Sequence, residues 1–120
     1  MAEPLHIGIL IYPNVTQLDA TGPAQVLARV PGAVLHMIWK TRDPIPTDAG
    51  FSIVPNTSFA DCPKLDVICV PGGGGQVALM TDPETLERVA AGYRAGGWSA
   101  QVDGDAFTAP FNAPSAGPPP

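Results

Sequence analysis

The chain has 120 residues, which is the usual size of one domain. Hydrophobic residues make up 45% of it, enough for a core, although it also contains 15 prolines and 13 glycines. The formal net charge is −5, and the 6 lysines and arginines are scattered singly. This composition excludes a basic surface for nucleic-acid phosphates or an anionic bilayer, so we expect neither nucleic acid nor a membrane as a partner.

The apolar stretch nearest the N-terminus, Leu5–Tyr12, is too short to span a bilayer. No lysine or arginine precedes it, so it does not resemble a signal peptide, and we expect the chain in the cytoplasm. Cys62 and Cys69 form no CxxC motif. In that compartment we expect two reduced thiols rather than a disulfide.

Runs of β-prone apolar residues alternate with helical patterns along the chain. The expected strands span residues 5–12, 33–40 and 65–70, and the expected helices span residues 22–30 and 83–95. In the first helix Thr21 is the expected N-cap, and Pro23 lies in the first turn. Strand–helix–strand alternation of this kind predicts an α/β domain with a parallel sheet and flanking helices.

Two other parts of the chain carry weaker signals. Residues 41–50 are rich in turn formers, and residues 51–54 with 57–59 predict a short hairpin or an edge strand. After residue 97 the periodicity ends and prolines accumulate. We therefore expect residues 1–97 to form the α/β part and residues 98–120 to form a proline-rich, poorly packed tail.

Asp19 is the first candidate for chemistry. Ligands of open α/β sheets bind beyond the carboxyl ends of the strands, and Asp19 lies in the loop after the first expected strand. A carboxylate near a helix N-terminus that is partly removed from water can have a raised pKa suited to proton transfer. The alternative is a plain loop or capping aspartate.

Gly72–Gly75 follows the third expected strand and precedes a helical turn. Its amides can point at a developing negative charge, but a tight turn between a strand and a helix explains the run equally well. No Gly-Lys-Ser/Thr ends the run, so it is not a phosphate-binding loop. His6 and His36 lie within apolar runs without metal-ligand spacing, and no metal site is expected.

Several segments within the first 95 residues occur together in a fixed order and spacing. They are Gln17–Pro23 (QLDATGP), Ile38–Lys40 (IWK), Ser58–Pro63 (SFADCP), Leu65–Gly73 (LDVICVPGG), Ala78–Met80 (ALM) and Asp82–Pro83. In these segments the chain resembles the isonitrile hydratase branch of the ThiJ/PfpI superfamily.

The resemblance implies part of a flavodoxin-like α/β fold, similar to the class I glutamine amidotransferases. It also implies hydration of an isonitrile to an N-substituted formamide without a metal or organic cofactor. In the family a cysteine thiolate attacks the isonitrile carbon, an aspartate transfers the proton, and water releases the formamide. Asp19 matches that aspartate, and Gly72 and Gly73 match the turn whose amides line the pocket of the nucleophile.

One motif of the family is missing from this chain. The nucleophilic cysteine of the family lies on an elbow resembling Ser-Val-Cys-Thr-Gly, shortly after the helix matched by Pro83–Arg94, and this chain contains no such segment. Neither Cys62 nor Cys69 replaces it, because both match ordinary positions of the family pattern. We therefore expect a family member that lost the elbow by an internal deletion and does not catalyse the reaction.

Two alternatives stay open. One is a non-catalytic module that senses a small molecule, similar to the N-terminal half of ThiJ/PfpI-type transcription regulators. The other is a truncated remnant with no selected function. The strands that follow the elbow in the family would leave one sheet edge unpaired when they are lost, so we expect a homodimer or a chain prone to aggregation.

Overall fold

The computed structural model describes residues 3–95, 101–103 and 106–108. Its elements, in chain order, are β1 (Leu5–Leu10), α1 (Gln17–Leu27), β2 (Ala33–Trp39), β3 (Ile45–Pro46), β4 (Ser52–Ile53), β5 (Thr57–Ser58), β6 (Val67–Cys69), α2 (Gln76–Leu79), α3 (Pro83–Ala95), β7 (Gln101–Asp103) and β8 (Ala106–Thr108). Over these ranges no helix is long and apolar enough to cross a membrane.

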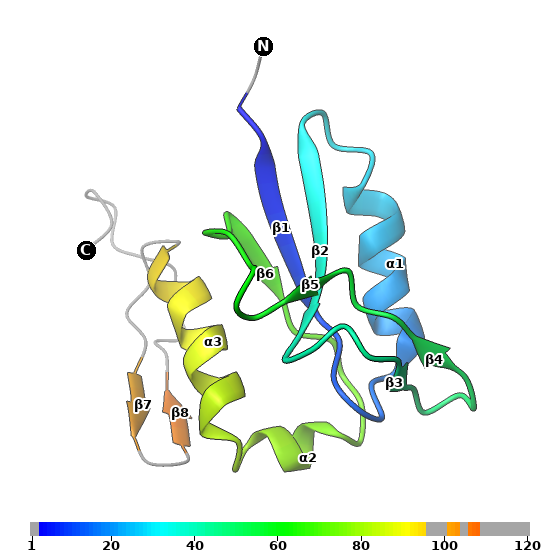
Figure 1. Cartoon of the computed structure of the whole chain (residues 1–120), viewed down its shortest axis with the longest axis vertical. Helices are drawn as coiled ribbons and strands as arrows, with labels where there is room; N and C mark the ends of the chain where they lie inside the picture. Colours follow the sequence, from blue (N-terminus) through cyan, green and yellow to red (C-terminus); the bar gives the residue numbers. More distant parts are fainter. Residues whose placement is uncertain (1–2, 96–100, 104–105, 109–120) are drawn as a thin grey trace.

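Four strands form one parallel sheet in the order β5-β2-β1-β6 (Figure 1). β1 lies inside the sheet and pairs with β2 along its whole length. On its other side β1 pairs with β6, where Ile9 lies opposite Cys69. The predicted parallel α/β sheet is confirmed, and the carboxyl ends of β1 and β6 lie side by side.

α1 and α3 cover opposite faces of this sheet. A Cβ atom built on Gly92 of α3 would lie 3.0 Å from the side chain of Ile68, so α3 packs closely on that face of β6. The next residue, Cys69, points to the other face, where Asp19 of α1 acts electrostatically on its thiol. β1 is therefore buried on both faces, which explains its continuous apolar sequence.

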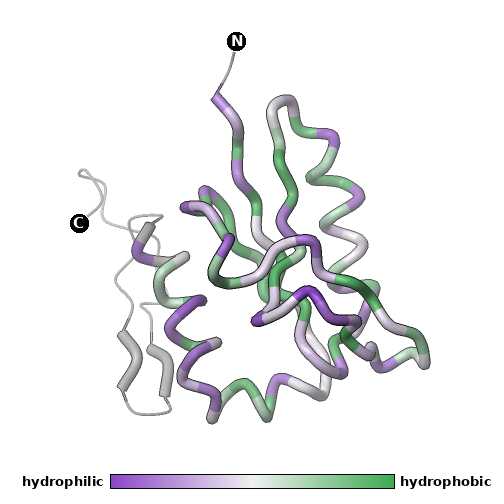
Figure 2. Tube along the Cα trace, viewed as in Figure 1, coloured by the Kyte–Doolittle hydropathy of each residue, from purple (hydrophilic) through white to green (hydrophobic). Residues whose placement is uncertain are grey.

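The core is built mainly from β1 and the segment that follows it. Figure 2 shows hydrophobic residues along much of β1 and β2, while hydrophilic residues recur along α3. That recurrence is the amphipathic pattern from which the helix was predicted. The fully buried side chains in the first part of the chain are Ile7, Ile9, Leu10, Ile11, Tyr12, Val15, Ala20 and Ile38.

α1 begins earlier than the sequence predicts, at Gln17. Thr16 occupies the N-cap position, and Pro23 lies inside the helix, where its missing N–H removes one backbone hydrogen bond. The earlier start is favoured by packing, because it places Ala20 fully inside the core. Asp19 therefore lies in the first turn of the helix and not in the predicted loop.

The sequence predicts the structure of residues 41–59 only in part. β3 lies in the segment predicted to be turn, and it pairs antiparallel with β4, so that Ile45 lies opposite Ile53. β5 does not pair with β4 but adds to the outer edge of β2 in parallel. Ile45 is only 5% exposed, and this burial outweighs the turn-forming residues around it.

β7 and β8 form an antiparallel pair that packs against α3 (Figure 1). Both strands lie within the segment 98–120 that the sequence separates from the α/β part. Residues 98–100, 104–105 and 109–120 of that segment lie outside the described residues. The boundary at residue 97 and the poor packing of the tail stay predictions.

Candidate functional site

The two segments that the sequence singles out meet at the carboxyl edge of the sheet. Asp19 lies in the first turn of α1, and Gly72 follows the end of β6. The backbone N–H of Thr16 donates to the carbonyl oxygen of Gly72 at 2.9 Å, which ties the start of α1 to the glycine turn. A Cβ atom built on Gly72 would lie 2.8 Å from Asp19 Oδ2. The carboxylate therefore lies directly against this glycine.

Gly73 occupies a backbone conformation that other residues rarely adopt. Its φ is +149°, and a Cβ atom built on it would lie 2.7 Å from the backbone nitrogen of Thr16. The N–H groups of Gly73 and Gly74 donate no hydrogen bond to another residue in the described part of the chain. They are donors at the edge where parallel sheets bind ligands, as an anion-stabilising turn requires.

Tyr12 is a buried phenol at the carboxyl end of β1, and it holds the turn in place. Its hydroxyl donates to the carbonyl oxygen of Pro71 at 2.6 Å, and Gln76 Nε2 donates to the same oxygen at 3.3 Å. Burial raises the pKa of Tyr12, and the Asp19 carboxylate raises it further. The phenol therefore stays protonated near neutral pH and remains a donor.

Sequence reasoning did not single out Tyr12. A signal was present, because a tyrosine is the last residue of the first apolar run and directly precedes Pro13. Its partner, the Pro71 carbonyl, is brought to it only by the pairing of β6 with β1.

Both cysteines are half-buried free thiols. Burial raises the pKa of Cys69, and the Asp19 carboxylate raises it further. Burial also raises the pKa of Cys62, although Arg88 Nη2 lies 3.4 Å from its Sγ and acts in the opposite direction. Neither environment favours the thiolate that a nucleophile requires.

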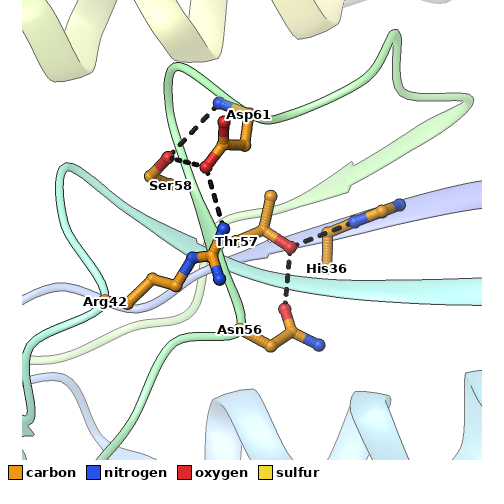
Figure 3. Close-up of polar contacts among 6 residues, drawn as sticks. All are labelled: His36, Arg42, Asn56, Thr57, Ser58 and Asp61. Carbon is orange, nitrogen blue, oxygen red and sulfur yellow. Dashed lines mark hydrogen bonds and ion pairs between the residues drawn. The ribbon is translucent and has the colours of Figure 1, made fainter.

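Asp61, the sequence neighbour of Cys62, does not account for the weak acidity of that thiol. Its carboxylate accepts hydrogen bonds from Arg42 Nη2 at 2.9 Å and from the Ser58 hydroxyl at 2.9 Å (Figure 3). These two hydrogen bonds lower the pKa of Asp61. Burial, not the neighbouring carboxylate, is the cause of the raised Cys62 pKa.

The two histidines contact each other across neighbouring strands. His6 Nδ1 lies 3.0 Å from His36 Nε2, and His36 Nδ1 lies 3.2 Å from the Thr57 hydroxyl, a contact drawn in Figure 3. Within residues 3–95 and the two short strands beyond, no three His, Cys, Asp or Glu side chains are grouped to hold a metal ion. The histidine pair links β1, β2 and β5.

Known proteins match this chain in sequence. A sequence profile described as the DJ-1/PfpI family matches residues 6–104. An isonitrile hydratase of Pseudomonas putida is 51% identical over 83 residues, which are 69% of this chain and 36% of that protein. The chain thus spans little more than a third of the length of this curated relative.

Solved structures match the fold. A ThiJ/PfpI family protein from Pseudomonas syringae has a TM-score of 0.70 and 38% identity, over 76% of this chain and 38% of that chain. DJ-1beta of Drosophila melanogaster has a TM-score of 0.68 over 78% of this chain and 52% of that chain, and at 22% identity it shows the fold alone. The flavodoxin-like sheet with flanking helices and the ThiJ/PfpI resemblance are both confirmed.

Proposed function

The chain belongs to the DJ-1/PfpI family, and on this basis we propose that its 120 residues carry the proton-transfer side of an isonitrile hydratase-like site without the nucleophile. The reaction of such a site is the hydration of an isonitrile to an N-substituted formamide, and it needs no metal or organic cofactor. The observation that carries the proposal is the contact of Asp19 with Gly72, in a chain that is 51% identical over 83 residues to an isonitrile hydratase.

Asp19 is suited to the proton transfer. When a thiolate adds to the isonitrile carbon, negative charge develops on that carbon, and a proton must be delivered to it. The first turn of α1 holds the Asp19 carboxylate beside the glycine turn, where the N–H groups of Gly73 and Gly74 have no partner among the described residues. A substrate atom seated there would meet both a carboxyl group, which can pass on the proton that it takes from the thiol of the nucleophile, and hydrogen-bond donors for its charge.

The nucleophile is the part that we propose this chain lacks. Cys69 lies close enough to Asp19 to be affected by its charge, but that charge and burial both favour the neutral thiol. Cys62 lies against Arg88 of α3 and keeps a raised pKa. Loss of the nucleophile from a catalytic triad leaves only about 10³- to 10⁴-fold acceleration over water, even in an intact pocket. We therefore propose that these residues do not turn over isonitriles.

The assay is direct. The purified 120-residue chain is mixed with an alkyl isonitrile, and the formyl proton of the formamide is followed by NMR against buffer. We expect the same rate with protein, with buffer and with the Asp19→Asn variant. Turnover that disappears in Cys62→Ser or in Cys69→Ser identifies that thiol as the nucleophile and contradicts the proposal. Turnover that survives both changes but not Asp19→Asn also contradicts it, because it requires a thiol-free mechanism.

A second candidate function is a non-catalytic module that senses a small molecule. It is favoured by a cavity of about 160 Å³ beside the glycine turn, which Val70 and Gln76 help to line. For either function we propose a cytoplasmic location and association of the chain with itself.

A further inference from the structure

We propose that the cavity beside the glycine turn binds one small, uncharged, apolar molecule. This proposal rests on the proposed sensing function and gives it a binding site and a class of ligand. The cavity lies between the carboxyl ends of β1 and β6 and the helices α2 and α3. Its volume is about 160 Å³. Its apolar lining consists of Leu10, Val70, Leu79, Met80, Leu86 and Val89, and the polar residues Gln76 and Thr85 complete it. None of the described residues that line the cavity is charged.

The inner walls are fixed by the core, and the mouth opens to solvent. Leu10 is fully buried, and Leu79 and Val89 are each 8% exposed, so these three side chains are held by packing on every other side. Val70 is 39% exposed and Met80 is 64% exposed. A ligand can therefore enter past Val70 and Met80 and reach a wall that already exists before it binds.

Both polar residues of the lining already donate a hydrogen bond within the protein. The Thr85 hydroxyl donates to Asp82 Oδ2 at 2.8 Å, and Asp82 in turn pairs with Lys40 at 2.6 Å. Gln76 Nε2 donates to the Pro71 carbonyl, while no other residue of the described chain donates to Gln76 Oε1. A charged ligand would lose its hydration and find no opposite charge, whereas an apolar ligand loses nothing and gains contacts.

The size of the cavity sets the size of the ligand. A cavity of roughly 150 Å³ lined by aliphatic side chains holds one molecule of benzene. The cavity here has nearly the same volume, so it fits a single ring or a short branched hydrocarbon group. Fluorobenzene is a suitable probe, because it has this size, carries no charge and is visible by ¹⁹F NMR.

The experiment titrates the full ¹⁵N-labelled chain with fluorobenzene and, separately, with benzoate. We expect saturable shifts for fluorobenzene, with a dissociation constant on the order of 1 mM and the largest changes at the amides of Val70, Leu79 and Val89. Benzoate is expected to shift none of these amides. Absence of saturable shifts, shifts centred elsewhere, or equal binding of benzoate would overturn the proposal.

Two variants add matched bulk inside and outside the cavity. Val70→Phe fills the mouth, and we expect the affinity for fluorobenzene to fall by about tenfold or more. Val77→Phe adds the same bulk to α2 at a side chain that is 73% exposed and does not line the cavity, and the affinity is expected to stay unchanged. Equal affinity of the two variants contradicts the site, and if Val70→Phe does not fold, the wild-type shift map decides. Because this titration measures binding and the isonitrile assay measures formamide, the two proposals fail separately.

Discussion

Gly73 has a strongly constrained backbone in the candidate site. Its φ of +149° is rare for any residue with a side chain, and a Cβ atom would lie 2.7 Å from Thr16 N and 2.8 Å from Asn14 O. Both of these atoms belong to the backbone, so they cannot move aside as a side chain can. The geometry that brings the glycine turn to Asp19 therefore depends on glycine at this position.

Gly73→Ala is expected to lower the free energy of unfolding by at least about 2 kcal/mol. The free-energy cost of the strained backbone and that of the steric overlap of the new Cβ atom add to each other. Urea denaturation measures the change. Gly74→Ala is the matched control, since a Cβ atom at Gly74 meets nothing within 4 Å, and its effect should stay within about 0.5 kcal/mol. Similar losses in both variants would show that the turn is not constrained in this way.

Asp82 connects α3 to the sheet through Lys40, whose Nζ lies 2.6 Å from Asp82 Oδ2. Burial raises the pKa of Asp82, but hydrogen bonds from Lys40 and Thr85 outweigh it and hold that pKa below its ordinary value of 3.8. The carboxylate therefore stabilises the fold above pH 3.8, and this stabilisation is lost as the pH falls through the lower folded pKa.

Asp82→Asn is accordingly expected to lower stability at pH 7 and to weaken the loss of stability below about pH 4. Denaturation at both pH values measures this. Asp43→Asn is the control, because Asp43 is an exposed turn residue whose carboxylate, among the described residues, accepts a side-chain hydrogen bond only from Thr41. An unchanged acid response in Asp82→Asn would contradict the role assigned to the ion pair.

Among the elements, those with strong local signals could be predicted and those fixed by distant contacts could not. β1, β2 and α3 follow from apolar runs and helical spacing. The start of α1 depends on the hydrogen bond between Thr16 and Gly72, and β3 depends on the burial of Ile45. Asp19 and the glycine turn could be found because both follow strands at the ligand-binding edge, whereas the role of Tyr12 depends on a carbonyl far away in the sequence.

The edge strand β5 is joined to the sheet through His36. Its Nδ1 lies 3.2 Å from the Thr57 hydroxyl, and its Nε2 lies 3.0 Å from His6 Nδ1. Burial lowers the pKa of His36 below its ordinary value of 6.5, and His6 lowers it further. Neutral His36 therefore stabilises the fold above pH 6.5, and this stabilisation is lost as the pH falls through the lower folded pKa.

We expect acidification from about pH 7.5 to about pH 5 to lower the protection of the amides in and beside β5 against hydrogen exchange, relative to the amides of β1. Protection here is the observed exchange rate compared with the intrinsic rate at the same pH. His36→Gln should remove most of this pH dependence, since its side chain does not titrate. Exchange near β5 that responds to pH equally in both proteins would exclude His36 as the cause.

At the scale of the whole molecule, β6 is an edge strand of the sheet that the described residues form. Within the described strands β6 pairs only with β1, and Val67 beside its free edge is 40% exposed. An unpaired edge offers backbone N–H and C=O groups to another strand, and exposed apolar side chains favour such pairing.

We therefore expect the chain to associate with itself as its concentration rises, which sedimentation velocity measures. Val67→Lys should weaken the association, because a charge on an edge strand opposes pairing. Val34→Lys is the control, since Val34 is 39% exposed but lies in β2, inside the sheet. A monomer at all concentrations, or equal effects of both changes, would contradict self-association through β6.

The central claim is that the site has no nucleophilic thiolate. The measurement that tests this claim most directly is the reactivity of the two thiols of the chain. Alkylation of Cys62 and Cys69 by iodoacetamide is followed by peptide mass spectrometry across the pH range. Because burial raises the pKa of both thiols above the ordinary value of 9.0, we expect both rates to keep rising with pH up to and beyond pH 9.0, without a plateau below it. Asp19→Asn should lower the apparent pKa of Cys69 and leave that of Cys62 unchanged. A thiol that is alkylated rapidly and at a constant rate at and above about pH 7 would be a thiolate, and it would contradict the account.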